Sequence, residues 1–157
     1  MKSINTGRRQ ALKTSGSLAV VVAAISAGVL PASAFADWNK AAFDAKSLND
    51  VLKAMDGASA EKSGDIAITA PDIAENGAVV PIAVASKIPG TQSIAILVEK
   101  NPSALSAQFD IPAGTEANVG TRVKMDQSSN VHAVVKANGK YYVATKEVKV
   151  TLGGCGG

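Results

Sequence analysis

Hydrophobic residues recur at two different spacings along this chain, first that of a helix and then that of β-strands. Four apolar residues within 37–55 stand at positions i, i+3, i+4 and i+7: Leu48, Val51, Leu52 and Met55. This spacing predicts an amphipathic helix within the segment 37–55. Ser47, followed three residues later by Asp50, predicts the capped start of this helix, and Gly57 predicts where it stops.

After position 64 the pattern changes to short runs of Val, Ile and Ala. Eight runs predict strands: 65–69, 78–86, 93–99, 104–111, 121–125, 131–137, 141–145 and 147–152. Pro, Gly and Asn separate most of them and predict turns. Because no helices lie between these strands, we expect residues 37–152 to form one all-β domain, an immunoglobulin-like antiparallel β-sandwich with an N-terminal amphipathic helix.

Asn138 and Gly139 give the sharpest turn signal. Both central residues of a type I′ turn need positive φ, which Asn and Gly tolerate best. A two-residue loop there pairs Val135 with Tyr142 and places His132 on the opposite face. As the single histidine of the chain, with no second Cys and no carboxylate cluster nearby, His132 lacks companions for a metal site and is expected to be a surface residue.

The first 36 residues have the pattern of an export signal peptide. Basic residues up to position 13 precede an apolar run at 18–25 that continues weakly to 30. Arg8 and Arg9 resemble the pair of the twin-arginine export motif, although their neighbours match it only in part, so export of an unfolded chain stays open. We expect cleavage after Ala36, with a second candidate site after Ala34.

A membrane anchor is the alternative for the same segment. Its strongly apolar part is shorter than the roughly 20 residues that a spanning helix needs, and Ser and Gly interrupt it. We therefore expect an exported protein with no membrane anchor.

The basic character of the chain belongs to that leader. Its first 13 residues hold four of the 16 Lys and Arg, while residues 37–157 hold the other 12 together with all 13 acidic residues. The mature part therefore carries a net charge of about −1 and offers no basic patch for phosphates. With aromatic residues at 4% of the sequence, stacking on bases is disfavoured too, so nucleic-acid binding is not expected.

The last predicted strand alternates, with Val148, Val150 and Leu152 expected to point inward, so it should stay in a sheet up to about Leu152. Five residues follow it: Gly153, Gly154, Cys155, Gly156 and Gly157. Because glycine has the largest backbone entropy to lose, these residues are expected to form a flexible tether. Three extended residues would carry the sulfur about 10 Å beyond the sheet.

Cys155 is the only cysteine of the chain, so it cannot form an intramolecular disulfide. In an exported protein, a lone exposed thiol indicates a reactive or intermolecular role. No cation closer than Lys149 and no helix N-terminus would lower the pKa of this thiol. We therefore expect Cys155 to be a site of covalent attachment on a carrier, with the catalytic groups on partner enzymes.

Residues 148–157, Val-Lys-Val-Thr-Leu-Gly-Gly-Cys-Gly-Gly, resemble the C-terminal signature of the SoxY family, the sulfur-carrier subunits of the bacterial thiosulfate-oxidising Sox system. The resemblance extends to the opening helix, to residues 77–82 and 122–124, and to the Asn-Gly hairpin. The functional cysteine of the family corresponds to Cys155. Leu152 stands where isoleucine is expected.

The resemblance implies a periplasmic carrier of thiosulfate-derived sulfur on Cys155. A SoxAX-like haem enzyme would join thiosulfate to the cysteine oxidatively, and a SoxB-like manganese hydrolase would then release sulfate. A sulfane dehydrogenase, where present, would oxidise the remaining sulfur. The carrier itself would hold no metal or cofactor and would form a heterodimer with a SoxZ-like subunit.

Two other interpretations of the tail stay open. In the first, the carboxylate of Gly157 becomes a thiocarboxylate, as in ubiquitin-like sulfur carriers. The predicted export signal opposes this interpretation, because formation of the thiocarboxylate requires ATP, which an exported protein would not meet. In the second, the chain is a structural or binding protein in which Cys155 forms an intermolecular disulfide.

Overall fold

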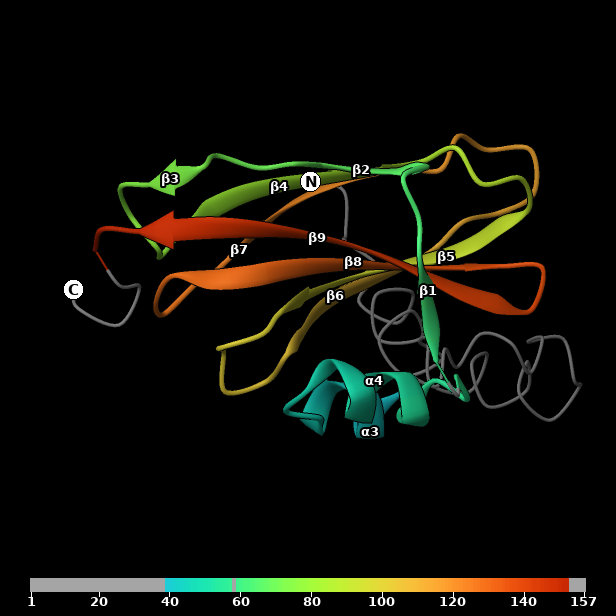
Figure 1. Ribbon diagram of the computed structural model, residues 1–157, viewed down its shortest axis with the longest axis horizontal. Coiled ribbons are helices and arrows are strands. Elements are labelled where there is room, and N and C mark those ends of the chain that lie inside the picture. The colour runs from blue at the N-terminus through green and yellow to red at the C-terminus, as the bar shows by residue number, and fades with distance from the viewer. Residues whose placement is uncertain (1–38, 58, 153–157) are drawn as a thin grey trace, which may run out of the picture. The chain divides into compact units, whose positions relative to one another are not determined.

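Two β-sheets lie face to face in the computed structural model, which describes residues 39–57 and 59–152 (Figure 1). Six strands form the larger sheet: β1 (Ala60–Lys62), β3 (Ile73–Ala74), β5 (Thr91–Val98), β6 (Leu105–Asp110), β8 (Ser129–Ala137) and β9 (Lys140–Val150). Three form the smaller sheet: β2 (Ile66–Thr69), β4 (Val80–Ser86) and β7 (Asn118–Val123). Their orders are β1-β9-β8-β5-β6, with β3 also pairing with β9, and β2-β4-β7. The predicted all-β sandwich is confirmed, while its immunoglobulin-like type stays a prediction.

Aliphatic side chains fill the space between the two sheets. Ile82 and Val84 of β4 are buried there together with Ile94 and Ile96 of β5. The same cluster includes Ile66, Val80, Val98, Val123, Met125, Val131, Ala133, Val135 and Val148. Because successive side chains of a strand point to opposite faces, each of these strands gives every second residue to this core.

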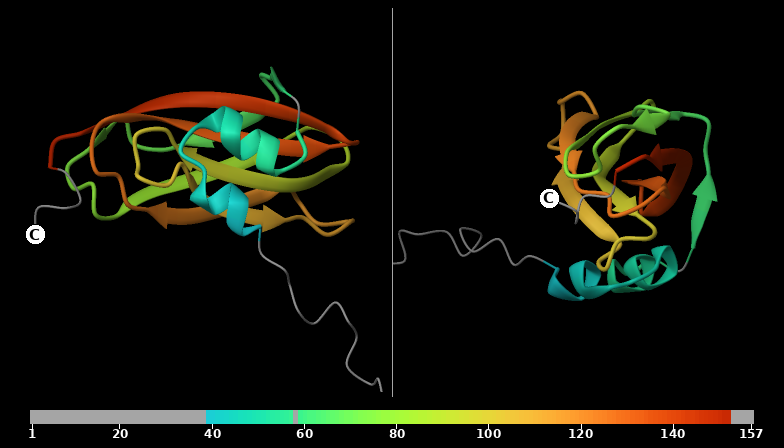
Figure 2. Two further views of the ribbon diagram at one scale, coloured as in Figure 1. Left: turned by 90° about the horizontal axis from the view of Figure 1, so that it is seen from below. Right: turned by 90° about the vertical axis from the view of Figure 1, so that its left-hand side faces the viewer.

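The outer face of the larger sheet packs against two short helices, α3 (Lys40–Asp44) and α4 (Leu48–Ala54) (Figure 2). Val51 and Leu52 of α4 form a second buried cluster with Ala95 and Leu97 of β5. Strand β5 is therefore covered on both faces, and its residues 93–98 are all buried. This explains why they are a nearly continuous apolar run rather than an alternating one.

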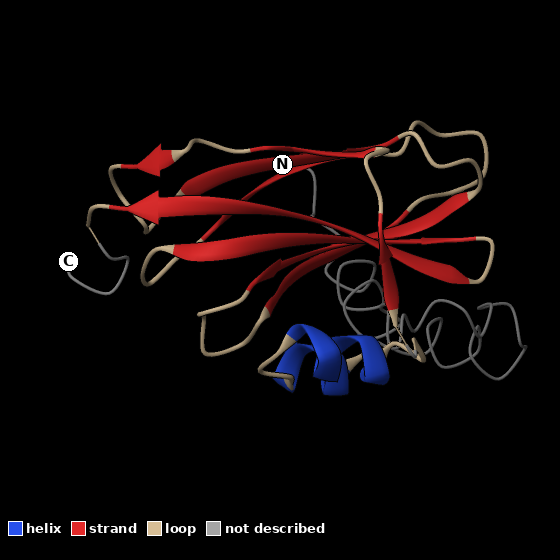
Figure 3. Cartoon of the chain, in the orientation of Figure 1, coloured by secondary structure: helices blue, strands red, loops and turns tan. Residues whose placement is uncertain are grey.

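Residues 39–55 form two short helices with an extended break between them (Figure 3). Helix α4 begins after Ser47, as predicted, and α3 is a further helix that the sequence analysis missed. Ala45 is extended, with ψ of 141°. Ser47 is the N-cap of α4, with φ of −136°, and its Oγ accepts a hydrogen bond of 3.2 Å from the N–H of Asp50. An N-cap residue has extended dihedrals, so the Ser47 signal that begins α4 also interrupts any helix that precedes it.

The end of α4 differs slightly from the prediction. Asp56, rather than Gly57, takes the left-handed conformation, with φ of 59°. The N–H of Gly57 then donates a hydrogen bond of 2.8 Å back to the carbonyl of Leu52. The same carbonyl also accepts a hydrogen bond of 3.1 Å from the N–H of Met55, so two backbone donors close the last turn of the helix on Leu52.

Strand β9 is one strand of 11 residues, where the sequence predicted two strands separated at Lys146. It pairs with β8 from Lys140 to Val148 without interruption. Lys146 is compatible with a strand, because its side chain reaches past the sheet to donate a hydrogen bond of 2.7 Å to the carbonyl of Ala70. By alternation, Lys146 lies on the same face of β9 as Ala144 and Val148, which contact the core between the sheets, so the break was predicted at a charged residue on the inward face.

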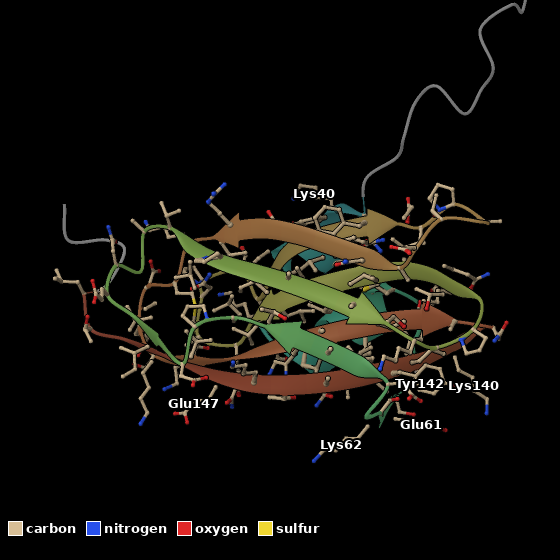
Figure 4. All side chains as sticks on the ribbon, turned by 90° about the horizontal axis from the view of Figure 1, so that it is seen from above. Lys40, Glu61, Lys62, Lys140, Tyr142 and Glu147 are labelled. Carbon is tan, nitrogen blue, oxygen red and sulfur yellow. The ribbon has the colours of Figure 1, made fainter. Side chains whose placement is uncertain are left out.

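The antiparallel description is wrong for β1 and β3, two short strands that the sequence analysis missed. Both pair in parallel with β9, β1 near its beginning and β3 at its end. Residues 60–74 follow β9 in the same direction. Between β1 and β3, this segment forms β2, which belongs to the smaller sheet. Glu61, Lys62 and Lys140 point into solvent along this edge (Figure 4). Short pieces and charged side chains of this kind protect a sheet edge from pairing with other chains.

The β8–β9 hairpin agrees with the sequence. Asn138 and Gly139 have φ of 51° and 74°, as a type I′ turn requires. Val135 pairs with Tyr142, and His132 lies on the other face of the sheet. The local turn signal therefore determined the register of the longest strand pair.

Candidate functional site at the end of the last strand

The predicted attachment site, Cys155, lies outside the residues that the structure describes. The same is true of its neighbours Gly153, Gly154, Gly156 and Gly157, and of Arg8 and Arg9 in the predicted export signal. What the structure does describe is the base of the tail, up to Leu152. The geometry of that base determines where the tail leaves the sandwich.

On one side, the end of β9 is held by a serine side chain. The last regular pair of the β8–β9 ladder joins Ser129 and Val148. Beyond it, the N–H of Val150 donates a hydrogen bond of 2.9 Å to Oγ of Ser128. The Ser128 hydroxyl lies 3.4 Å from the carbonyl of Val150. Ser128 therefore takes the place of a strand residue where the regular ladder has ended.

On the other side, the segment that joins β3 to β4 holds the same stretch of backbone. The N–H of Thr151 donates to the carbonyl of Ala74 at 3.1 Å, and its hydroxyl donates to the carbonyl of Glu75 at 3.1 Å. The N–H of Gly77 then donates to the carbonyl of Leu152 at 2.8 Å. The main chain is thus hydrogen-bonded up to the residue directly before Gly153.

Gly77 also connects this base to the body of the sandwich. Its carbonyl accepts a hydrogen bond of 2.7 Å from the N–H of Met125, whose side chain is fully buried. Both polar groups of the Gly77 backbone are therefore used, one toward the core and one toward the tail. The point where the tail begins is fixed relative to the core by this pair of bonds.

The side chain of Leu152 corrects a prediction. Val148 is fully buried, as expected, but Leu152 is 63% exposed. The smaller sheet does not extend far enough to cover it, because β4 begins only at Val80. Strand β9 itself ends at Val150 and residues 151–152 form a bend, so the strand alternation that was expected to point Leu152 inward no longer applies.

Charges at this end of the sheet are mixed in sign. Lys146 Nζ lies 3.0 Å from Oδ1 of Asp72. Lys149 and Glu75 are exposed nearby along the chain. Because the two signs alternate, this surface does not present one dominant charge to a partner.

His132 is more enclosed than the surface residue that we predicted, and its side chain is 12% exposed. Its Nδ1 lies 2.8 Å from the hydroxyl of Thr145, and its Nε2 lies 3.6 Å from a carboxylate oxygen of Glu99. Asn130 donates a hydrogen bond of 2.9 Å to the same carboxylate. No pattern in the sequence indicated this cluster, because Glu99 and His132 are brought together by the pairing of β5 with β8.

The pKa values of this pair are both lowered. Burial lowers the pKa of His132 below 6.5, because the charged ring would lose hydration, and the Glu99 carboxylate opposes this only in part. The hydrogen bond from Asn130 is the main reason that the pKa of Glu99 lies below 4.5. His132 pairs with Thr145 rather than with the tail end of β9, so we assign this cluster to stability and not to sulfur chemistry.

Residues 39–57 and 59–152 contain no group of three or more His, Cys, Asp or Glu side chains that could hold a metal ion. In the same residues, no helix is both long and apolar enough to cross a membrane. At this end of the larger sheet, a strand end that is hydrogen-bonded up to Leu152 precedes the sequence Gly-Gly-Cys-Gly-Gly.

Comparison with known proteins decides the family. The sequence model of the family described as "Sulfur oxidation protein SoxY" matches residues 52–155, two thirds of the chain. The chain belongs to the SoxY family. The match begins in α4 and ends on Cys155, so it includes the sandwich and the predicted attachment site.

A solved structure supports the same assignment. The chain is 42% identical to the sulfur carrier protein SoxY from Chlorobium limicola f thiosulfatophilum, over 73% of this chain and 100% of that one, with a TM-score of 0.63. A superoxide reductase (neelaredoxin) from Ignicoccus hospitalis is 21% identical over 54% of this chain and 78% of its own, with a TM-score of 0.48. No match was found among the curated proteins.

The resemblance to SoxY that residues 148–157 indicated is thus confirmed. Membership of this family assigns the chain to sulfur oxidation, in the role of a sulfur carrier.

Proposed function

We propose that this SoxY protein carries thiosulfate-derived sulfur covalently on Cys155 in the periplasm. The observation that carries the proposal is the position of the cysteine. It is the third residue after Leu152, whose carbonyl accepts a hydrogen bond from Gly77 and belongs to the last residue that the structure describes. In the related SoxY of Chlorobium limicola, the printed description is that of a sulfur carrier. A rigid base followed by two glycines and a thiol suits such a role.

The proposed cycle begins with loading. The Cys155 thiol and thiosulfate form an S–S bond, giving a cysteine S-thiosulfonate, and the reaction releases one proton and two electrons. A SoxAX-like haem enzyme takes up the electrons. This chain supplies the sulfur nucleophile and its tether, and the partner supplies the oxidant.

The second step is hydrolysis by a SoxB-like enzyme. Water attacks the terminal sulfonate, sulfate leaves, and a persulfide remains on Cys155. A sulfane dehydrogenase, where present, oxidises that remaining sulfur. Glycines on both sides of Cys155 favour this exchange between enzymes, because a backbone without side chains can enter a narrow active-site channel.

Export and partnership complete the proposal. Arg8 and Arg9 support export by a twin-arginine route, in which the protein folds before transport and a SoxZ-like partner without its own signal could cross the membrane with it. The proposed heterodimer with that partner is supported by the resemblance to the SoxY family. The carrier itself binds neither haem nor metal.

The test is intact-mass and peptide mass spectrometry on protein from cells supplied with thiosulfate. We expect a reductant-labile thiosulfonate or persulfide on the peptide that contains Cys155. A mass shift on the Gly157 carboxylate would instead support the thiocarboxylate interpretation. Disulfide-linked dimers alone would support the structural one.

Cys155→Ser is the matching variant. It should abolish thiosulfate turnover, because serine forms no S–S bond, and should leave the midpoint of thermal unfolding unchanged. An unfolded or partnerless variant would contradict a tail that is independent of the core.

A further inference from the structure

A polar pocket lies on the outer face of the larger sheet, beside the end of α4. Met55 and Tyr141, which are part of its lining, belong to the buried cluster beneath the helices. The pocket has a volume of about 330 Å³, at the lower end of the range for small-molecule sites. Most of its other lining residues are polar, among them Asp56, Gln92, Ser93, Gln108, Asp110 and Lys136. Such a lining suits a small polar ligand.

Strand register sets part of this lining in one row across the sheet. Ser93 of β5 pairs with Asp110 of β6 on one side and with Lys136 of β8 on the other. Lys136 in turn pairs with Tyr141 of β9, and its Nζ lies 5.5 Å from the centre of the Tyr141 ring. Residues directly opposite each other point to the same face of a sheet. A carboxylate and an ammonium group therefore flank the Ser93 hydroxyl.

Ser93 is a buried polar residue whose hydroxyl has no partner in the described part of the chain. Its exposed fraction is 6%, and residues 39–57 and 59–152 provide no hydrogen bond to its side chain. In the same residues, every fully enclosed side-chain nitrogen or oxygen has a partner, so this hydroxyl is open to the pocket. A buried hydroxyl without a hydrogen bond costs stability, which a polar ligand would restore.

The charged groups of the pocket also have no ion-pair partner among residues 39–57 and 59–152. This holds for Asp56 and Asp110 on one side and for Lys136 on the other. The pocket thus provides acceptors for a positive group and, across Ser93, donors for a negative group. A ligand that carries both charges would match both sides.

Ligands of a single charge fit this arrangement less well. A metal ion would lie close to the ammonium of Lys136, and the described residues include no group of three metal-binding side chains. A simple anion would be repelled by the carboxylates of Asp56 and Asp110. These two exclusions leave a zwitterion as the class that the charges favour.

The spacing of the row indicates the size of that zwitterion. Two cross-strand steps separate Asp110 from Lys136, which puts their Cα atoms roughly 10 Å apart. Side chains stand roughly perpendicular to a sheet, so the two charges are separated by a similar distance. Hydrogen bonds of about 3 Å at each end leave about 4 Å between the charged groups of the ligand. An amino acid has its ammonium and carboxylate groups at such a separation.

We propose that this pocket binds a free amino acid. Its ammonium group pairs with the carboxylate of Asp110, and its carboxylate accepts hydrogen bonds from Lys136 and from the hydroxyl of Ser93. Asp56, at the end of α4, adds a second carboxylate on the side of the ammonium group.

The proposed amino-acid site is separate from the sulfur chemistry of the tail. It lies at the end of the sheet where β9 begins, and the tail follows the other end of β9 (Figure 1). From Tyr141 to Val150 the strand is about 30 Å long, whereas the tail is expected to reach about 10 Å. Cys155 is therefore not the occupant, and the site is independent of the function proposed above.

The experiment is an NMR titration of the purified mature protein, in which the backbone amides of Ser93, Asp110 and Lys136 are followed. L-alanine and L-glutamine are the probes. Ethylammonium and propionate are the matched controls, because each is alanine without one of its two charged groups. We expect saturable shifts with the amino acids at a Kd below about 1 mM, and none with either control.

Two substitutions test the assigned contacts. Asp110→Asn and Ser93→Ala should each raise Kd at least about tenfold, because each removes one hydrogen-bonding partner of the charged ligand. Asp65→Asn removes an exposed carboxylate outside the pocket and should bind like the wild type. Asp110 is exposed and Ser93 is buried, so the first variant keeps the test valid if the second does not fold.

Three results would overturn the proposal: no saturable shift with either amino acid, an equal response to propionate or ethylammonium, or a wild-type Kd in Asp110→Asn. None of these measurements involves Cys155 or its adduct. The amino-acid site and the carrier function can therefore fail separately.

Discussion

The N–H of Gly77 donates a hydrogen bond of 2.8 Å to the carbonyl of Leu152, two residues that are 75 positions apart in the sequence. Within residues 59–152, this bond is the one nearest to the C-terminal glycines. Together with the contacts of Thr151 and Ser128, it makes the sandwich rigid up to the residue before the tail.

The Ser128 contact should be measurable by substitution. Ser128→Ala removes the acceptor for the N–H of Val150 and should lower the free energy of unfolding by about 0.5 to 1.5 kcal/mol. The amide of Val150 should also exchange its hydrogen faster. Ser103→Ala, at an exposed position away from β9, is the control and should change neither quantity. Unchanged exchange at Val150 would show that Ser128 does not hold the strand end.

Gly57→Ala should destabilise the helical layer. A Cβ at position 57 would lie 2.9 Å from a ring carbon of Tyr141 and 3.2 Å from the carbonyl of Leu52. The ring cannot move freely, because the Tyr141 hydroxyl donates to the carbonyl of Met55. We expect a loss of about 1 to 3 kcal/mol in chemical denaturation, as for other overpacked sites.

Gly64→Ala is the matched control for that substitution, because nothing lies within 4 Å of the position that its Cβ would take. It should change the free energy of unfolding by less than about 0.5 kcal/mol. Equal effects of the two substitutions would mean that the contact with Tyr141 is not the cause.

The turn contact between Gly90 and Asn138 gives a second packing prediction. Gly90 has φ of 72°, and a Cβ there would lie 2.6 Å from Oδ1 of Asn138. The side chain of Asn138 is held in place, since it donates a hydrogen bond of 2.9 Å to the carbonyl of Pro89. Gly90→Ala should therefore cost about 1 to 3 kcal/mol in thermal or chemical unfolding. Gly114→Ala has a similar φ of 84° but no atom within 4 Å, so the difference between the two variants isolates the clash.

His132 should make stability depend on pH in a defined window. Its pKa lies below the ordinary 6.5 in the folded chain, so the unfolded chain binds the proton more readily. The contribution is complete above pH 6.5 and is lost as the pH falls through that value toward the pKa of the folded chain. Urea denaturation between about pH 7.5 and 5.5 should show this loss, and His132→Gln should reduce the slope.

The titration of Glu99 falls in a different window. Because its pKa is lowered from 4.5, its contribution is present above pH 4.5 and is lost only as the pH falls below that value. The chain has no second histidine. An unchanged slope in His132→Gln would therefore exclude His132 as the group responsible.

The sequence was most informative where structure is set locally. Asn138 and Gly139 predicted a turn whose φ values the structure confirms, because the two residues meet the dihedral requirement by themselves. Strands β1 and β3 could not be predicted in this way. They are three and two residues long and are strands only because β9 lies beside them.

In the candidate site too, the part that depends on local sequence could be predicted, and the part that depends on contacts between distant residues could not. The importance of Cys155 came from its being the only cysteine, among glycines, in a segment that the family match includes. The base of the tail could not be predicted, because Gly77 meets Leu152 only after the loop between β3 and β4 has returned to β9. Leu152 was assigned to the core for a related reason, since an alternating pattern does not indicate where the opposite sheet ends.

Strand β5 has a consequence for how this protein unfolds. Ile94 and Ile96 belong to the core between the sheets, while Ala95 and Leu97 belong to the core beneath the helices. Separating either layer would expose one complete face of the same strand to water, with the loss of its apolar burial. The helices and the smaller sheet should therefore come apart in one cooperative transition, although they do not share a single hydrophobic cluster.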